Sequence, residues 1–173
     1  CAGASEQAMS QWSSLFAETG LKVSKNMGDL LGPCFFALLM GISRTIYGIY
    51  GAKMNLIKSI VASSILCIFS YCVAVFSPIP IVALFACAVC GFSVGIMWPG
   101  VFSLSAKKYP QGGTAMFALL ALAGDVGCSS GPGLVGIIAN YSGQLKDGLM
   151  FAMVFPVVLV ICIYMLHKSK STT

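Results

Sequence analysis

The chain has 173 residues and a net charge of +5; 58% of its residues are hydrophobic and only 9% are charged. Soluble domains carry about 25% charged residues, so the composition excludes a soluble protein and indicates an integral membrane protein. The basic residues separate apolar segments instead of clustering in a motif, which argues against nucleic acid as a partner and favours lysines at a membrane surface.

Six apolar segments follow one another along the chain, and we expect all of them to be helical. The first is partial and covers residues 1–17; because the residues after Cys1 already have mid-helix character, we interpret it as starting part-way along a span. Five complete spans, each long enough to cross a bilayer, are expected at 30–50, 57–76, 79–103, 114–139 and 149–166, followed by a tail at 167–173.

The first segment carries a polar stripe. Its members are Glu6, Gln7, Ser10, Gln11 and Trp12. Gln7 and Gln11 are four residues apart and share a helix face, and Glu6 and Ser10 share the neighbouring one. Such a stripe cannot face lipid without a large cost. We therefore favour a solute-binding surface, with amides and a carboxylate for hydroxyl groups and an indole for the apolar face of a sugar, over a purely interhelical hydrogen-bond network.

Arg44 lies near the inner end of the second span. We interpret it as an anchor whose long side chain reaches the membrane surface, in preference to a role in binding or gating.

The fourth and fifth spans contain helix-perturbing residues. The candidates for kinks or gates are Gly91, Gly95, Pro99, Gly131 and Pro132. Close helix packing explains the glycines taken alone. With prolines in both spans and an acid in the fifth, we favour helices that line a cavity and bend.

Asp125 is the only charged residue between Lys108 and Lys146. In a helix it lies roughly 25 Å from each lysine, near mid-membrane, where ionisable groups are paired or functional. Glu6 is expected at a similar depth, about 18 Å below Glu18. We therefore expect Glu6 or Asp125 to couple proton movement to solute movement.

Lysine and arginine placement predicts the orientation. The inner side is expected to hold Arg44, Lys53, Lys58, Lys107, Lys108, Lys168 and Lys170, and the outer side Lys22, Lys25 and Lys146. This bias puts the C-terminus in the cytoplasm.

The eight cysteines are expected to act as small hydrophobic residues, since most lie inside spans. With a single histidine and no nucleophile–base pair or cofactor loop, we expect no metal, no cofactor and no enzymatic activity.

This succession of a polar partial helix and five apolar spans resembles the C-terminal half of a major facilitator superfamily carrier, from within the seventh helix to the end of the twelfth. It is most similar to bacterial sugar transporters of the fucose permease group, whose seventh helix carries an acidic stripe with Gln and Trp. In the superfamily motif after the eighth helix, Gly48 and Lys53 match the first glycine and the base, whereas Ala52 and Asn55 replace the acid and the second glycine.

The resemblance implies a twelve-helix fold of two six-helix halves, with solute bound between them by alternating access. The first, second, fourth and fifth spans here would line the cavity, and the third and sixth would face lipid. It implies a missing N-terminal half, without which the chain does not transport, and a multi-pass protein of a bacterial inner membrane.

The expected function is secondary active, proton-coupled transport of a small polar solute such as a sugar. The alternatives are an exporter of amphipathic drugs, or a membrane scaffold or sensor of the same fold that has lost transport.

Overall fold

The computed structural model describes residues 1–20, 22 and 24–168, and all regular structure within them is helical. The elements are α1 (Ala2–Leu15), η1 (Phe16–Gly20), α2 (Lys25–Asp29), η2 (Leu30–Cys34), α3 (Phe35–Tyr50), α4 (Leu56–Phe76), α5 (Pro80–Lys108), α6 (Gly113–Ser142), α7 (Leu145–Ala152) and α8 (Val154–Lys168). Lys170 and the rest of the expected tail from residue 169 onward lie outside the described residues.

Within the part of the chain that the structure describes, five helical stretches are long and apolar enough to cross a membrane. They run over Lys25–Tyr50, Leu56–Phe76, Pro80–Lys108, Gly113–Ser142 and Leu145–Leu166. The prediction of an all-helical chain with five complete apolar spans is confirmed, and these lengths suit a multi-pass membrane protein.

Several spans, the second and the fourth among them, extend further than their apolar residues predict. The second begins at Lys25 instead of residue 30, and it passes Pro33 through η2, a wider π-helical turn that absorbs the missing backbone donor. The fourth continues to Lys108 instead of residue 103. Lysines in a last turn interact favourably with the helix dipole, so this helix extends beyond its apolar part.

The last span is interrupted where the sequence predicts a continuous helix. α7 ends at Ala152, Met153 forms a turn, and α8 starts at Val154. Pro156 explains the break, because its ring clashes with the carbonyl of Ala152 and it has no backbone N–H to donate.

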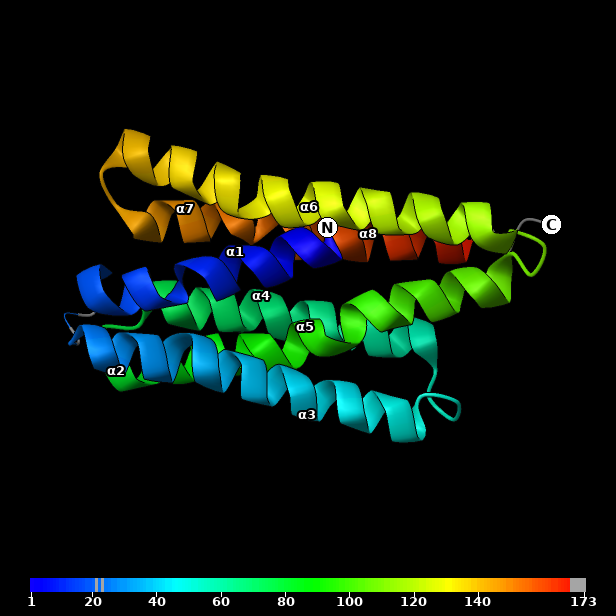
Figure 1. Cartoon of the computed structure of the whole chain (residues 1–173), viewed down its shortest axis with the longest axis horizontal. Coiled ribbons are helices and arrows are strands. Elements are labelled where there is room, and N and C mark those ends of the chain that lie inside the picture. Colours follow the sequence, from blue (N-terminus) through cyan, green and yellow to red (C-terminus); the bar gives the residue numbers. More distant parts are fainter. Residues whose placement is uncertain (21, 23, 169–173) are drawn as a thin grey trace.

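α5 lies at the centre of the bundle, packed against α4, α3 and α1 (Figure 1). Its contact with α4 contains the buried Cys67, Tyr71 and Cys90, and the sulfurs of the two cysteines are 3.9 Å apart. The Tyr71 hydroxyl donates to the backbone carbonyl of Ser5 at 2.8 Å. This bond ties α4 to α1 through the core.

Most of the large apolar side chains that remain exposed belong to the long helices. Ile65 and Phe69 on α4, and Ile161 and Met165 on α8, are all more than half exposed. An apolar surface of this kind suits contact with lipid.

The charged residues outside the helix interiors separate to the two ends of the bundle. One end, here called the lysine-rich end, is formed by the 51–55 and 109–112 loops and the last turn of α8, on the right of Figure 1. Its lysines are Lys53, Lys58, Lys107, Lys108 and Lys168. The opposite end holds Glu18, Lys22, Lys25, Asp29, Lys146 and Asp147.

Candidate functional site

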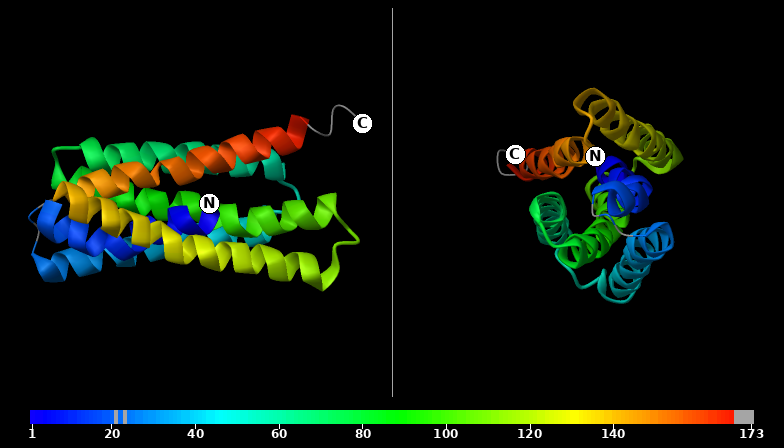
Figure 2. Two further views of the ribbon diagram at one scale, coloured as in Figure 1. Left: turned by 90° about the horizontal axis from the view of Figure 1, so that it is seen from above. Right: turned by 90° about the vertical axis from the view of Figure 1, so that its left-hand side faces the viewer.

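The polar stripe of α1 lies on one open side of the bundle. Figure 2 shows α1 between α6 and the α2–α3 helix, so one of its faces has no neighbouring helix. The opposite face buries small residues such as Ala4, Ser5 and Ala8 against the bundle. The stripe is therefore the side of α1 that the fold leaves accessible, flanked by α3 and α6.

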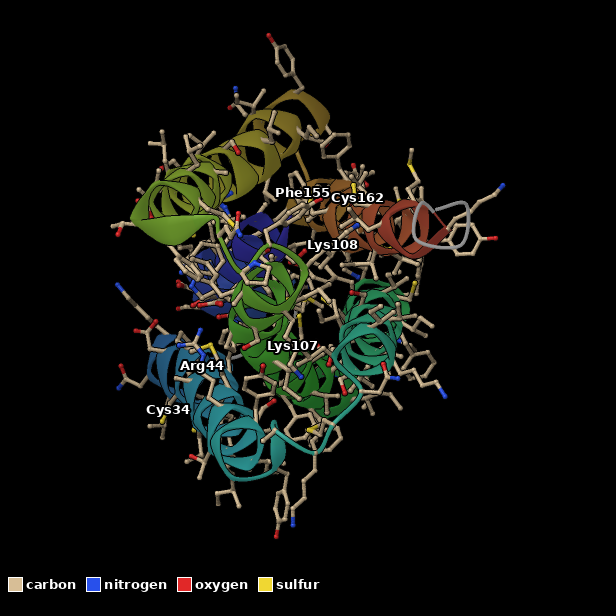
Figure 3. The ribbon with its side chains drawn as sticks, turned by 90° about the vertical axis from the view of Figure 1, so that its right-hand side faces the viewer. Cys34, Arg44, Lys107, Lys108, Phe155 and Cys162 are labelled. Atoms are coloured by element: carbon tan, nitrogen blue, oxygen red, sulfur yellow. The ribbon has the colours of Figure 1, made fainter. Side chains whose placement is uncertain are left out.

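Glu6 forms an ion pair with Arg44 of α3. One guanidinium nitrogen, Nη2, lies 3.0 Å from Glu6 Oε2 and 3.2 Å from Oε1. The Glu6 side chain is 15% exposed and that of Arg44 is 43% exposed. Figure 3 labels Arg44 on the helix beside α1. The interpretation of Arg44 as only a surface anchor therefore needs correction, because its guanidinium also neutralises the acid of the stripe.

Three members of the stripe line a groove with α6. The groove has a volume of about 520 Å³ and is formed by Gln7, Gln11, Trp12, Cys128, Ser129, Pro132 and Gly133. The Gln11 amide donates to the Gln7 side-chain oxygen at 3.2 Å. The bond leaves further donors and acceptors on both amides for a ligand.

Trp12 is fixed against α6 by its ring and its N–H. Nε1 donates to the backbone carbonyl of Pro132 at 3.0 Å, and the ring packs on Gly136, where an added Cβ would lie 2.9 Å from it. This position gives the groove a rigid aromatic wall.

Ser10 is half-buried and does not line the groove. Its backbone carbonyl accepts a hydrogen bond from the Ser13 hydroxyl at 3.1 Å.

Asp125 is exposed on α6, and within the described residues its carboxylate has no hydrogen-bond or ion-pair partner. It shares a face with Cys128, Ser129 and Pro132, since these lie three, four and seven residues further along the helix. Cys128 also lines the groove with Gln7 and Gln11 of the α1 stripe. Both acids are thus on the same open side, one neutralised and one not.

Trp98 of α5 is a neighbour of this face that the sequence did not single out for binding. Its ring packs directly on Gly124, the residue before Asp125. The centroid of the Trp98 ring lies 4.9 Å from that of Phe102, and the Phe102 centroid lies 5.9 Å from that of Phe117, so the three rings form an aromatic cluster. The signal was available, because a tryptophan within an apolar span and a glycine on a neighbouring span can pack together.

The candidate kink residues mainly mediate close packing between helices. Added Cβ atoms at Gly91 and Gly95 would collide with α3, and one at Gly131 would lie 2.7 Å from the Ala4 carbonyl oxygen of α1. α5 and α6 run through Pro99 and Pro132 without a break in the helix. Packing accounts for the three glycines, and neither proline interrupts its helix.

The loop motif lies at the lysine-rich end. Gly48 and Lys53 are exposed, and Gly48 has open space around its α-carbon. Asn55, which replaces the second glycine of the motif, caps α4 by accepting a hydrogen bond from the Lys58 N–H at 3.1 Å. In this chain, the last residue of the motif, Asn55, is therefore the N-cap of α4.

Among the described residues, no three histidine, cysteine, aspartate or glutamate side chains lie close enough to hold a metal ion. Searches of protein families, curated proteins and solved structures give no match to this chain.

The ion pair leads to a testable prediction. A Glu6→Gln or an Arg44→Gln substitution leaves one charge uncompensated among apolar helices, whereas the double substitution removes both charges. We expect the double variant to be more stable than the sum of the two single effects predicts, by about 1 kcal/mol, a value kept small because water screens the partly exposed Arg44. Thermal unfolding of the full-length protein and its three variants measures this coupling, and strictly additive effects would contradict it.

Proposed function

We propose that this chain belongs to a secondary active transporter that moves a small polar solute, a sugar or similar polyol, by alternating access. The observation that carries the proposal is the open side of the bundle, where hydrogen-bonding groups of α1 lie beside α6 and where the Asp125 carboxylate, within an otherwise apolar stretch of α6, has no ion-pair partner among the described residues. Polar groups within such a stretch need protein or water beside them. A water-filled path for a solute meets that need.

The polar groups on this side also require a second set of helices opposite α1, α3 and α6. Gln11, Arg44 and Asp125 are exposed on this side, and contact with acyl chains would cost several kcal/mol for each. A second six-helix half facing this side, as in major facilitator superfamily carriers, would enclose the groove between the two halves.

The two acids receive different roles. Glu6 is held by Arg44 of α3, so we assign it to the link between α1 and α3 beside the solute groove. Asp125 has no such partner among the described residues. We therefore assign proton coupling to Asp125, which no ion pair among the described residues ties to a neighbouring helix.

The groove favours hydroxyl-bearing solutes. Gln7 and Gln11 present amide groups, Ser129 adds a hydroxyl, and Trp12 supplies an aromatic wall in the same groove. Amides bind sugar hydroxyls through both donors and acceptors, and an indole packs against the apolar face of a sugar ring.

The proposed orientation puts the lysine-rich end in the cytoplasm of a bacterial cell. Lys53, Lys58, Lys107, Lys108 and Lys168 lie at that end. No aspartate or glutamate accompanies them, whereas Glu18, Asp29 and Asp147 offset the lysines of the opposite end. This asymmetry follows the positive-inside bias.

Uptake by cells expressing the full-length protein tests the proposal. A panel of radiolabelled sugars and polyols is supplied with an inward proton gradient, and again after the gradient is collapsed. We expect at least one member to accumulate only with the gradient, and a Gln7→Ala/Gln11→Ala variant to require a higher solute concentration for half-maximal uptake. Gradient-independent efflux of amphipathic dyes, with no sugar uptake, would instead favour a drug exporter.

A further inference from the structure

A cavity at the lysine-rich end lies away from the proposed solute groove. It has a volume of about 300 Å³ and lies between the start of α4, the last turns of α5 and the last turns of α8. Its apolar wall includes Ile57, Leu104, Ile163 and Leu166. α4 and α8 also carry the exposed apolar faces described above, so the cavity lies beside the surface expected to contact lipid.

Two lysines complete this cavity. Lys107 and Lys108, at the end of α5, belong to its lining, and Figure 3 labels both in the middle of this end of the bundle. The Lys108 ammonium donates to the backbone carbonyl of Leu166 at 3.3 Å and lies 5.7 Å from the centre of the Tyr109 ring. These contacts hold one of the two charges at the edge of an apolar wall.

The positive charge at this end is not balanced by acidic side chains. The chain has five Asp and Glu residues: Glu6 and Asp125 lie on the solute side, and Glu18, Asp29 and Asp147 lie at the opposite end. Among the described residues, no aspartate or glutamate side chain therefore lies at this end to pair with Lys107 and Lys108, which line an apolar cavity. An anion bearing an apolar tail matches both the charge and the wall.

We propose that this cavity binds an anionic phospholipid of the bilayer, with the headgroup phosphate between Lys107 and Lys108 and the first carbons of an acyl chain on Leu104, Ile163 and Leu166. A phospholipid matches both the two lysines and the apolar wall, because its charged headgroup lies at the depth of the membrane surface and its acyl chain extends along α4 and α8. Basic residues near the cytoplasmic leaflet attract anionic lipid headgroups. The lipid would link α4, α5 and α8 on the side opposite the solute groove.

Lipid selectivity of the full-length protein tests the proposal without any mutation. The protein is purified in an uncharged detergent and stripped of lipid, and phosphatidylglycerol, phosphatidylcholine or inorganic phosphate is then added. Native mass spectrometry counts bound lipid, and thermal unfolding reports stabilisation. We expect phosphatidylglycerol to bind and to raise the Tm, and the zwitterionic lipid and free phosphate to have little effect. Equal binding of the two lipids would overturn the proposal, and equal stabilisation by free phosphate would identify a simple anion site instead.

A Lys107→Gln/Lys108→Gln variant tests the position of the site. At about 1 kcal/mol for each lysine, we expect its affinity for phosphatidylglycerol to fall about 30-fold. The matched control, Lys25→Gln/Lys146→Gln, removes the same charge at the opposite end and should retain the wild-type affinity. Equal losses in the two variants would contradict a site at Lys107 and Lys108.

Salt dependence of the wild-type protein gives a third measurement that does not require a stable variant. Raising the ionic strength from about 0.1 M to about 1 M shortens the Debye length from about 10 Å to about 3 Å. Phosphatidylglycerol binding should weaken strongly over this range. Binding that does not change with salt would overturn the role of the two lysines.

Discussion

An Asp125→Asn substitution is expected to reduce proton-driven solute accumulation by at least about tenfold, which corresponds to about 1.4 kcal/mol. The asparagine keeps the size of the side chain but cannot exchange a proton, and the described residues offer no second unpaired acid on this side of the bundle. Exchange of labelled solute for unlabelled solute across the membrane, without a gradient, should continue because the amides of α1 are intact. Accumulation and exchange are measured in vesicles that contain the full-length protein.

Asp147→Asn is the matched control for this substitution. It removes the same charge from the first turn of α7, at the end of the bundle away from the groove, and we expect nearly wild-type accumulation. The proton-coupling hypothesis is contradicted if a Glu6→Gln/Asp125→Asn double variant still concentrates solute in response to a pH gradient.

A Gly91→Ala substitution is expected to destabilise the bundle by about 1–3 kcal/mol, the usual cost of forcing extra atoms into a packed contact. The added Cβ would overlap the backbone carbonyl oxygen of Phe36 and lie 2.9 Å from its carbonyl carbon. Because the obstacle is backbone, α3 and α5 must move apart to admit it. The midpoint of thermal unfolding of the full-length protein measures the effect.

Gly41→Ala provides the comparison on α3 itself. A Cβ at Gly41 meets no atom within 4 Å, so we expect no loss, and a gain of up to about 1 kcal/mol from the better helix propensity of alanine. Similar destabilisation by both substitutions would mean that the close α3–α5 contact at Gly91 is not the cause.

The five apolar spans and their helical structure could be predicted from sequence because the bilayer leaves few options. Long stretches without charge, such as residues 59–106, must satisfy their own backbone hydrogen bonds, and a helix does so locally. The residues at which the helices begin and end could not be predicted in this way. Lys25 and Lys108 extend helices past their apolar residues, and Pro156 interrupts one inside them.

The composition of the candidate site was partly visible in the sequence. Gln7, Gln11 and Trp12 were predicted to form a surface, and they line one groove. Glu6 and Ser10 were predicted on the same surface but lie outside that groove, and Trp98 was not predicted as a neighbour of Asp125. Helix periodicity specifies which residues share a face, but not which helix lies opposite that face.

The glycines illustrate the same limit. Gly91, Gly95 and Gly131 taken alone were predicted to allow close helix packing, and a gated, cavity-lining helix was favoured only when an acid on the same helix was considered with them. Their contacts with α3 and α1 depend on the order in which helices surround α5.

By itself, the sequence determined that this is an all-helical chain with five apolar spans, a polar first helix and one acid isolated in the fifth span. These properties depend on neighbouring residues along the chain and on the cost of placing polar groups in lipid. Only the tertiary structure decided that Glu6 is neutralised by Arg44, 38 residues away, while Asp125 has no such partner among the described residues. The reason is physical: an ion pair requires a few ångströms between two side chains, and that distance is set by how α1, α3 and α6 pack together.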